Sequence, residues 1–175
     1  MMTIRLRCGP TACEVAPEIG GAILSLSVGG VPILRPTLEG CRDVLDTACF
    51  PLVPFANRID SGQFVFRGRE ILLPEDPAAP PHAHHGQGWR RMWTADRTGE
   101  DYADLSLLHE RDDWPWRYRA TQNLKTTADG LSVEVSAFSS VMPRSRRSDA
   151  GPITGWKTPT CRSEDGSERC SGSDG

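Results

Sequence analysis

Three of the chain's four histidines stand in the stretch PHAHHGQGWRRMW, residues 81–93. An imidazole can exchange a proton, bind a metal ion, or donate a hydrogen bond to a ligand. On an extended backbone His82 and His84 share one face, and His85 points to the other. The stretch therefore leaves three alternatives open: a metal site, exposed loop histidines, or a ligand contact made by one histidine.

The metal site is the least favoured of these alternatives. A compact set of three imidazole ligands would need a bend at Gly86, and no cysteine lies nearby to complete it. Glu75 and Asp76 stand across a proline-rich loop. We therefore expect no metal. The ligand-contact alternative selects His85, because the glycines that follow it let a backbone or a ligand approach closely.

Two tryptophans follow the glycines in the same stretch. Trp93 is expected to fill the core between two sheets. Trp89 lies beside the glycine-rich turn, where an aromatic ring can stack on the apolar face of a sugar. Trp89 is therefore our candidate for an aromatic sugar contact.

A second candidate set is the Asn57-Arg58 pair in FPLVPFANRIDSGQFVFRGREILLP, residues 50–74. Two prolines keep the start of this segment out of a central strand and make it a stiff mount for polar groups. Arginine presents a planar fork of donors, and asparagine offers donors and an acceptor, so the pair suits a hydroxyl-rich ligand. The alternative is that Arg58 pairs with Asp60 and Asn57 caps a turn.

A third set, in HERDDWPWRYR, residues 109–119, combines His109 with Glu110 and Asp112. Carboxylates near a histidine can act as general acid and base. The charged end of a hairpin explains the same residues and is the favoured interpretation. The sequence contains no GxSxG, P-loop or HExxH motif.

The elements that must position these residues are expected to be strands. Residues 3–8 and 22–28 alternate apolar and polar side chains, and Gly29-Gly30 predicts a tight hairpin turn. A second hairpin is predicted over residues 62–73, with its turn at Arg67-Gly68. Further strands are predicted in the segments RRMWTADR, ADLSLLHE, WRYRATQNLKTT and LSVEVSAF, with a turn at Asp129-Gly130. The pattern indicates an all-β fold, an antiparallel sandwich or barrel.

Composition limits the function classes. The net charge of −3 gives no basic field for nucleic acid or an anionic membrane, and no apolar run is long enough to span a membrane. The N-terminal stretch lacks the apolar core of a secretory signal. The six cysteines form no CxxC pair, so reduced thiols and a cytoplasmic location are expected.

The composition changes abruptly after Met142. Serine, glycine and charged residues dominate 143–175, which cannot bury enough apolar area to offset its ordering entropy, so this segment is expected to be disordered. It is either a native flexible tail or the result of an interrupted reading frame. We expect one domain over residues 1–142 whose sandwich is incomplete, and a separate tail.

The segment FPLVPFANRIDSGQFVFRGREILLP, followed by PHAHHGQGWRRMW, resembles the N-terminal half of the aldose 1-epimerase (galactose mutarotase) family. The family pattern is Phe-Pro-Leu-x-Pro-x-x-Asn-Arg-Ile, a Gly-x-Phe-x-Phe-x-Gly hairpin, then His-x-x-His-Gly with a tryptophan nearby. The resemblance spans roughly residues 3–143. It implies a large antiparallel β-sandwich, the galactose mutarotase-like supersandwich, with a sugar bound in an open cleft on one sheet.

The implied reaction interconverts the α and β anomers of an aldose. A base takes the proton of the anomeric hydroxyl, an acid protonates the ring oxygen, and the ring opens and recloses on the other face. The resemblance implies no cofactor, a hexose or hexose phosphate as ligand, and substrate-binding roles for Asn57, Arg58 and His85. No role is carried onto His84.

The family's catalytic residues have no counterpart here. The family's acid is a histidine shortly after a Met-Pro that matches Met142-Pro143, and this chain reads RSRRSDAGPITGW there. The family's base is a glutamate far towards its C-terminus. We assign no catalytic residue and expect a truncated, weakly active or inactive protein. The alternatives are a non-catalytic carbohydrate-binding module, or a half-domain that needs a partner chain and self-associates through an exposed sheet edge.

Overall fold

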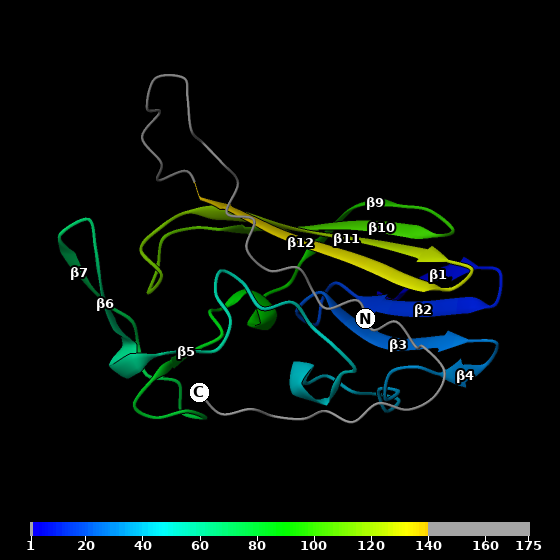
Figure 1. Cartoon of the computed structure of the whole chain (residues 1–175), viewed down its shortest axis with the longest axis horizontal. Helices are drawn as coiled ribbons and strands as arrows, with labels where there is room; N and C mark the ends of the chain where they lie inside the picture. Colours follow the sequence, from blue (N-terminus) through cyan, green and yellow to red (C-terminus); the bar gives the residue numbers. More distant parts are fainter. Residues whose placement is uncertain (1, 140–175) are drawn as a thin grey trace, which may run out of the picture.

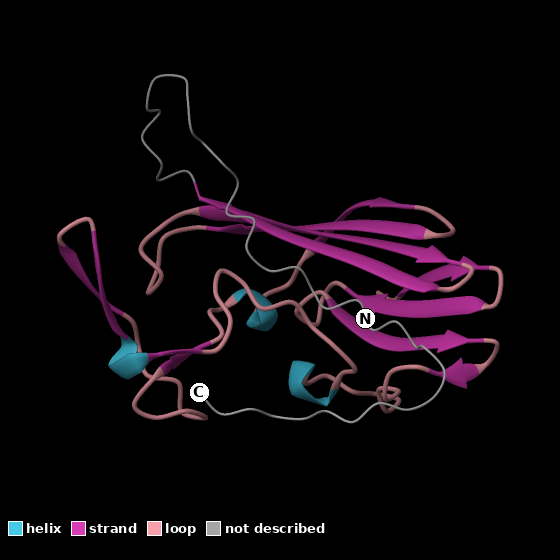
Figure 2. Cartoon of the chain, in the orientation of Figure 1, coloured by secondary structure: helices cyan, strands magenta, loops and turns pink. Residues whose placement is uncertain are grey.

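Two four-stranded antiparallel sheets face each other and enclose the main core (Figure 1). The computed structural model of the chain describes residues 2–139. Strands dominate, and the helices are single 3-10 turns (Figure 2). The predicted all-β sandwich is confirmed. The prediction of a disordered tail over 143–175 lies outside the described residues.

The first sheet has the order β1-β2-β3-β4. Its strands are β1 (Ile4–Cys8), β2 (Thr11–Ala16), β3 (Ala22–Val28) and β4 (Val31–Pro32). The turn at Gly29-Gly30 is confirmed, because Val28 pairs with Val31 and both glycines have the positive φ that a tight hairpin needs. Strand β2 was not predicted, although its buried residues alternate in the same way.

The second sheet has the order β12-β11-β10-β9. Its strands are β9 (Thr94–Thr98), β10 (Tyr102–His109), β11 (Tyr118–Thr127) and β12 (Gly130–Ser139). Thr127 pairs with Gly130, so the last turn is Ala128-Asp129, one residue before its predicted place. Gly130, the first residue of β12, has a φ of 155°. Glycine adopts this backbone conformation readily because it has no Cβ.

The core lies between the inner faces of the two sheets. Leu6 from β1 and Val15 from β2 are fully buried against Leu105 of β10 and Leu124 of β11. Period-two alternation in both sheets sends these side chains inward. Trp93 joins this core and donates its indole N–H to the Gly88 carbonyl at 3.0 Å, which confirms its predicted core position.

The remaining elements come between β4 and β9 along the chain. The hairpin β6 (Gln63–Phe66) and β7 (Arg69–Leu72) turns at Arg67-Gly68 as predicted. Strand β5 (Arg58–Ile59) precedes this hairpin along the chain, and β8 (Ala83–His84) follows it and pairs with β5. The 3-10 turns are η1 (Val44–Asp46), η2 (Asp60–Gly62) and η3 (Gly88–Arg90). Among residues 2–139 no helix has the length and apolar character that spanning a bilayer requires.

Candidate functional site

The two motifs singled out in the sequence meet in the pair formed by β5 (Arg58–Ile59) and β8 (Ala83–His84). The strands are antiparallel, with Arg58 opposite His84. One step further along, Asn57 lies opposite His85. Residues 28 positions apart in the chain therefore form one corner, which we call the Asn57–His85 corner: Asn57, Arg58 and His85.

Two hydrogen bonds close this corner. The Asn57 amide donates to Nδ1 of His85 at 2.8 Å, and the His85 amide donates to the Asn57 carbonyl at 2.9 Å. Both residues have a positive φ, 67° for Asn57 and 59° for His85. Such a conformation is costly for residues with a Cβ. It persists only where contacts with the surrounding structure offset that cost, and such places are often functional sites.

The hydrogen bond fixes the chemistry of the His85 ring. An amide N–H can only donate, so Nδ1 carries no proton and the proton of the neutral ring is on Nε2. Burial, together with the neighbouring charges of His84 and Arg58, lowers the pKa of His85 below its ordinary value of 6.5. His85 is therefore neutral near pH 7 and offers one N–H donor.

The glycines after His85 allow the loop to lie against the proline segment. The Gly88 amide donates to the Val53 carbonyl at 2.9 Å. A Cβ at Gly86 would lie 2.6 Å from that same carbonyl oxygen and from Cδ of Pro54, and a Cβ at Gly88 would lie 2.2 Å from a Val53 methyl. The close approach expected at these glycines is thus made by the backbone of residues 53–54.

Trp89 occupies a different place from the one expected of a sugar-stacking residue. It is 4% exposed, and its ring stacks on Phe50 with centroids 5.6 Å apart. The Arg90 guanidinium lies 4.1 Å from the centroid of the same ring. The indole N–H donates to the Gly86 carbonyl at 3.0 Å. These contacts argue against a sugar contact and favour a role for Trp89 in supporting the His85 loop.

Arg58 is exposed and free to bind. Its guanidinium makes no ion pair or hydrogen bond with any residue in 2–139, whereas Asp60, the partner considered from the sequence, lies 3.3 Å from Nδ1 of His82. The alternative of an Arg58–Asp60 ion pair is therefore not what the structure contains. The five N–H donors of Arg58 therefore have no partner among residues 2–139.

An ion pair between a buried carboxylate and a half-exposed arginine lies on the far side of the corner. Asp76 is 5% exposed; Nη2 of Arg90 lies 2.8 Å from its Oδ2, and the Ala78 amide donates to its Oδ1 at 2.9 Å. Burial alone would raise the pKa of Asp76, but the Ala78 amide and the Arg90 guanidinium outweigh burial and lower it. Arg90 thus links the carboxylate to Trp89 beneath the His85 loop.

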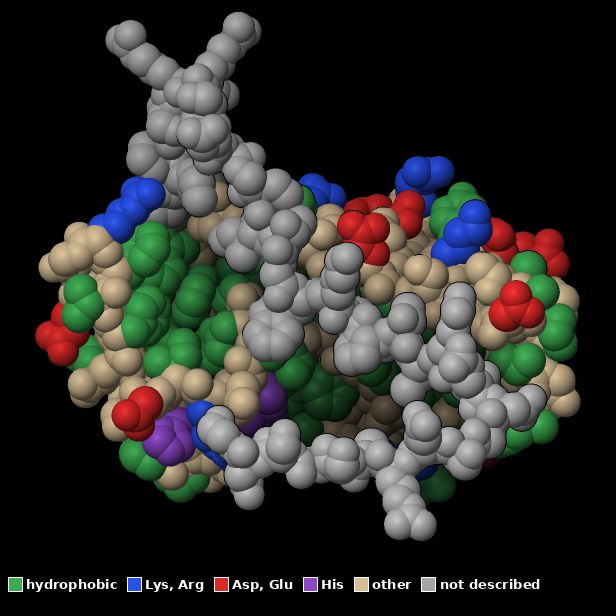
Figure 3. All heavy atoms as spheres, in the orientation of Figure 1, with side chains coloured by type: hydrophobic (Ala, Val, Ile, Leu, Met, Phe, Trp, Pro, Cys, Tyr) green, Lys and Arg blue, Asp and Glu red, His purple; other side chains and the backbone are tan. Residues whose placement is uncertain are grey.

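Aromatic side chains from three segments form a cluster at the same end of the molecule. We call it the aromatic wall: Phe55, Phe64, Phe66, Trp114 and Trp116. Ring centroids of neighbouring members are 5.1–6.3 Å apart. No member is fully buried. Figure 3 shows this apolar field over the β6–β7 hairpin, next to histidine side chains. Sequence reasoning missed it, because the three segments meet only through the fold.

The third sequence set is explained by structural contacts. His109 is 5% exposed; its ring stacks on Tyr118, and the Gln87 amide nitrogen lies 3.1 Å from its Nε2. Glu110 pairs with Arg117, and Asp112 pairs with Arg91 at 2.9 Å. These contacts fit the charged hairpin end that we favoured.

The histidine stretch was also considered from the sequence as a metal site. No group of three His, Cys, Asp or Glu side chains within 2–139 is placed to hold an ion. Nδ1 of His82 accepts the Ser61 amide, and Nδ1 of His85 accepts the Asn57 amide.

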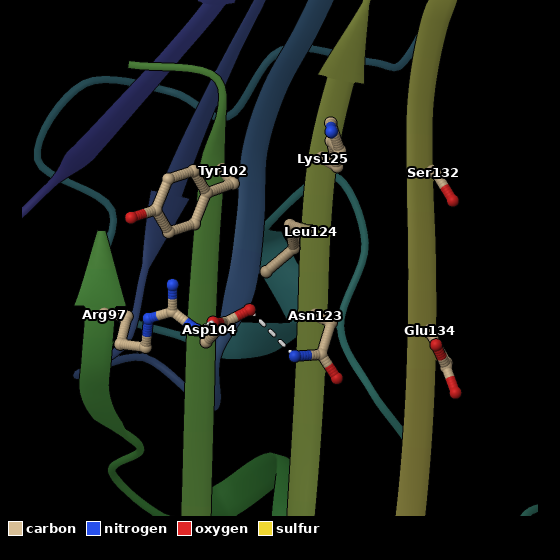
Figure 4. A pocket seen from close by; sticks show the side chains of 8 residues that line it. All are labelled: Arg97, Tyr102, Asp104, Asn123, Leu124, Lys125, Ser132 and Glu134. Atoms are coloured by element: carbon tan, nitrogen blue, oxygen red, sulfur yellow. Dashed lines mark hydrogen bonds and ion pairs between the residues drawn. The ribbon is translucent and has the colours of Figure 1, made fainter. Parts of the chain in front are cut away.

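A shallow hollow of about 380 Å³ lies elsewhere, on the outer face of the second sheet (Figure 4). Asn123 donates to Asp104 at 2.8 Å, and Arg97 lies 3.7 Å from the same carboxylate. Three of its polar residues are thus paired with one another, and none of its lining residues belongs to the Asn57–His85 corner.

A sequence model of the aldose 1-epimerase family matches residues 2–144. The chain belongs to the aldose 1-epimerase family. The uncharacterized protein YphB of Escherichia coli K12 is 37% identical over 136 residues, which are 77% of this chain and 46% of that protein. The residues that the family model matches include both motifs that meet at the corner.

Solved structures of aldose 1-epimerase relatives share the fold. A putative aldose 1-epimerase from E. coli K12 superposes with a TM-score of 0.71 at 33% identity, over 79% of this chain and 46% of that chain. A galactose mutarotase-like protein from Clostridium acetobutylicum gives 0.65 at 18% identity, over 77% and 45%. The chain therefore spans about half the length of the relatives it matches.

Proposed function

We propose that this chain binds an aldose at the Asn57–His85 corner. The observation that carries the proposal is the exchange of two hydrogen bonds between Asn57 and His85, which leaves Nε2–H of His85 and the guanidinium of Arg58 as donors for a ligand. Adjacent sugar hydroxyls are acceptors at the spacing that an arginine fork can bridge. Membership of the family supports an aldose as the ligand class.

In this proposal each residue has a stated task. Arg58 donates to two hydroxyls of the ring, and the neutral His85 ring donates from Nε2 to a third oxygen. Asn57 holds His85 in place and offers its side-chain amide. A ligand is thereby oriented without any proton transfer to the chain, which is positioning rather than acid–base catalysis.

The family reaction, interconversion of α and β anomers, is proposed to be weak or absent in this chain. Anomer exchange requires a base at the anomeric hydroxyl and an acid at the ring oxygen. His85 as a neutral Nε2–H donor has no free lone pair for the base, because Nδ1 is occupied by the Asn57 amide. Polarisation of the sugar by Arg58 and His85 alone gives at most a small acceleration.

A non-catalytic carbohydrate-binding module is the second candidate, and the aromatic wall favours it. Partly exposed indole and phenyl rings beside polar donors match the two faces of a pyranose, one apolar and one rich in hydroxyls. The two candidates share the ligand and differ in whether a weak anomer exchange remains or none does.

Two measurements test the proposal. Isothermal titration with glucose, galactose and their 6-phosphates measures binding, and polarimetry on freshly dissolved α-glucose and α-galactose measures turnover. We expect saturable binding of at least one sugar and little rate above the spontaneous one. Absence of binding to all of them contradicts the proposal, and a rate proportional to protein concentration contradicts the low turnover.

The cytoplasm is the proposed location, and no nucleic-acid partner is proposed. The four cysteines within 2–139 are all free thiols, which suits a reducing compartment. A net charge of −3 gives no field that would attract a polyanion.

A further inference from the structure

A buried imidazole contacts both parts of the proposed sugar site. His109, the last residue of β10, is 5% exposed. Its ring stacks on that of Tyr118, the residue opposite it in β11, with centroids 4.7 Å apart. A ring that is buried in this way does not touch a ligand, so any role of His109 in the site acts through the residues that it contacts.

The first contact of His109 is with the loop that carries His85. The side-chain nitrogen of Gln87, two residues after His85, lies 3.2 Å from Nδ1 and 3.1 Å from Nε2 of His109. A hydrogen bond in the ring plane reaches only one of these nitrogens, because the two point in different directions. Nearly equal distances therefore place the Gln87 amide over the ring face, where an N–H group can point at the π electrons. This contact ties the His85 loop to the end of β10.

The second contact of His109 is with the turn that carries Trp114 of the aromatic wall. Nε2 of His109 lies 3.3 Å from the Trp114 carbonyl oxygen and 3.3 Å from Oδ1 of Asp112. Both oxygens are acceptors, so the proton of the ring is on Nε2. The same Asp112 oxygen accepts the Trp114 amide at 3.0 Å. The N–H of one imidazole thus helps to hold Trp114 in place.

These contacts complete a closed series around the proposed site. On the other side the aromatic wall is joined to the corner through Phe55, whose ring centroid lies 5.6 Å from that of Trp114 and which precedes Asn57 by two residues. In order of contact the members are Asn57, His85, Gln87, His109, Trp114 and Phe55. His109 is the one buried member of this series.

We propose that His109 is a positioning residue of the sugar site. It fixes the His85 loop relative to Trp114, so that one aldose meets the N–H donors of the corner and the rings of the aromatic wall together. The inference rests on the proposed function, in which the corner donates to the hydroxyls of an aldose. A site whose parts are fixed before binding orders fewer groups when the ligand arrives, and it therefore binds more tightly.

The first test is a double-mutant cycle on the affinity of the full chain for glucose and galactose, measured by isothermal titration. Gln87→Leu and His109→Leu each break the link and should each raise the dissociation constant roughly 3- to 10-fold. Because both variants break the same link, the double variant should bind no more weakly than His109→Leu alone.

Glu110→Gln is the matched control for this cycle. Glu110 follows His109 in the chain, but its side chain accepts a hydrogen bond from Arg117, so affinity should not change. Single variants that bind like the wild type would overturn the proposal. Effects of Gln87→Leu and His109→Leu that multiply in the double variant would overturn it as well.

A second measurement needs no ligand and separates this proposal from the proposed function. Gln87→Leu leaves the buried His109 ring and its stack on Tyr118 in place, so the variant should fold. In nitrogen-15 spectra of the free variant, the His85 ring signals should broaden and move towards those of an exposed histidine, and in Glu110→Gln they should not. Unchanged His85 signals in Gln87→Leu would overturn the proposal whether or not a sugar binds. Changed signals in a protein that binds no sugar would support the link and contradict the proposed function.

Discussion

Asn57 and His85 hold each other in left-handed backbone conformations through two reciprocal hydrogen bonds. Each bond uses a backbone amide, and one of them ends on the His85 ring nitrogen at 2.8 Å. The ring is thereby fixed both in orientation and in tautomer. These two hydrogen bonds leave His85 as a neutral imidazole whose one N–H donor, on Nε2, faces away from Asn57.

The first prediction concerns the two adjacent histidines. His85→Ala should weaken aldose binding by roughly 10- to 100-fold, because a hydrogen bond to the ligand and the lock on Asn57 are both lost. His84→Ala should change affinity little, although His84 stacks on His85 with ring centroids 3.5 Å apart. Isothermal titration of both variants provides the comparison. Equal losses of affinity in the two variants would contradict a specific role for His85.

The second prediction concerns the glycine after His85. Gly86→Ala should destabilise the fold by about 3 kcal/mol or more, because φ is +63° and the new methyl would lie 2.6 Å from the Val53 carbonyl oxygen. Gly68→Ala is the matched control: its φ is +75°, but nothing lies within 4 Å, so only the backbone cost of about 1–2 kcal/mol applies. Urea denaturation measures both free energies of unfolding, and similar losses would contradict the close packing of the loop.

The third prediction concerns pH. The pKa of His85 is below 6.5 in the folded chain, so the unfolded chain binds more protons between the two values. Stability from this group is therefore complete above pH 6.5 and is lost as pH falls from 6.5 through the lowered folded pKa. Aldose affinity should fall in the same direction, because protonated Nδ1 cannot accept the Asn57 amide.

The variant His85→Asn isolates this effect, since asparagine tolerates a left-handed backbone and does not titrate. The difference in unfolding free energy between the wild type and this variant should shrink as pH falls below 6.5. A difference that is constant from pH 7 to pH 5 would contradict the assigned state of the ring.

The fourth prediction concerns the ion pair beneath the loop. Arg90→Met should cost about 1–3 kcal/mol, because it leaves the 5% exposed Asp76 carboxylate without its charged partner. Arg91→Met removes a pair of the same type and a similar length, 2.9 Å, in which both residues are exposed, and should cost less than about 1 kcal/mol. Thermal or urea unfolding of the two variants measures the difference.

Much of the fold could be predicted because its signals are local. Alternation identifies a strand such as β3, and the glycines after Val28 identify its turn. The weak apolar pattern of Thr11–Ala16, rich in small residues, left β2 unpredicted. Its burial depends on the opposite sheet, which no local pattern contains.

The candidate site was predictable in its residues but not in its contacts. Residue type made Asn57, Arg58 and His85 candidates, and the resemblance to the family selected them. Their hydrogen bonds, however, join segments 28 positions apart through two-residue strands that are too short to be recognised from sequence. Trp89 shows the same limit. The sequence of a tryptophan beside a glycine turn is the same whether its ring is exposed or, as here, stacked on Phe50.

The central claim is that an aldose binds to the Nε2–H of His85 and the guanidinium of Arg58. Nitrogen-15 NMR of the histidine rings tests it most directly. The free protein should show His85, assigned by its loss in His85→Ala, as neutral with the proton on Nε2. Adding the aldose should shift that resonance saturably and leave the buried His109 unchanged, and Arg58→Met should abolish the shift. A His85 signal with its proton on Nδ1, or one that does not respond to any aldose, would contradict the account.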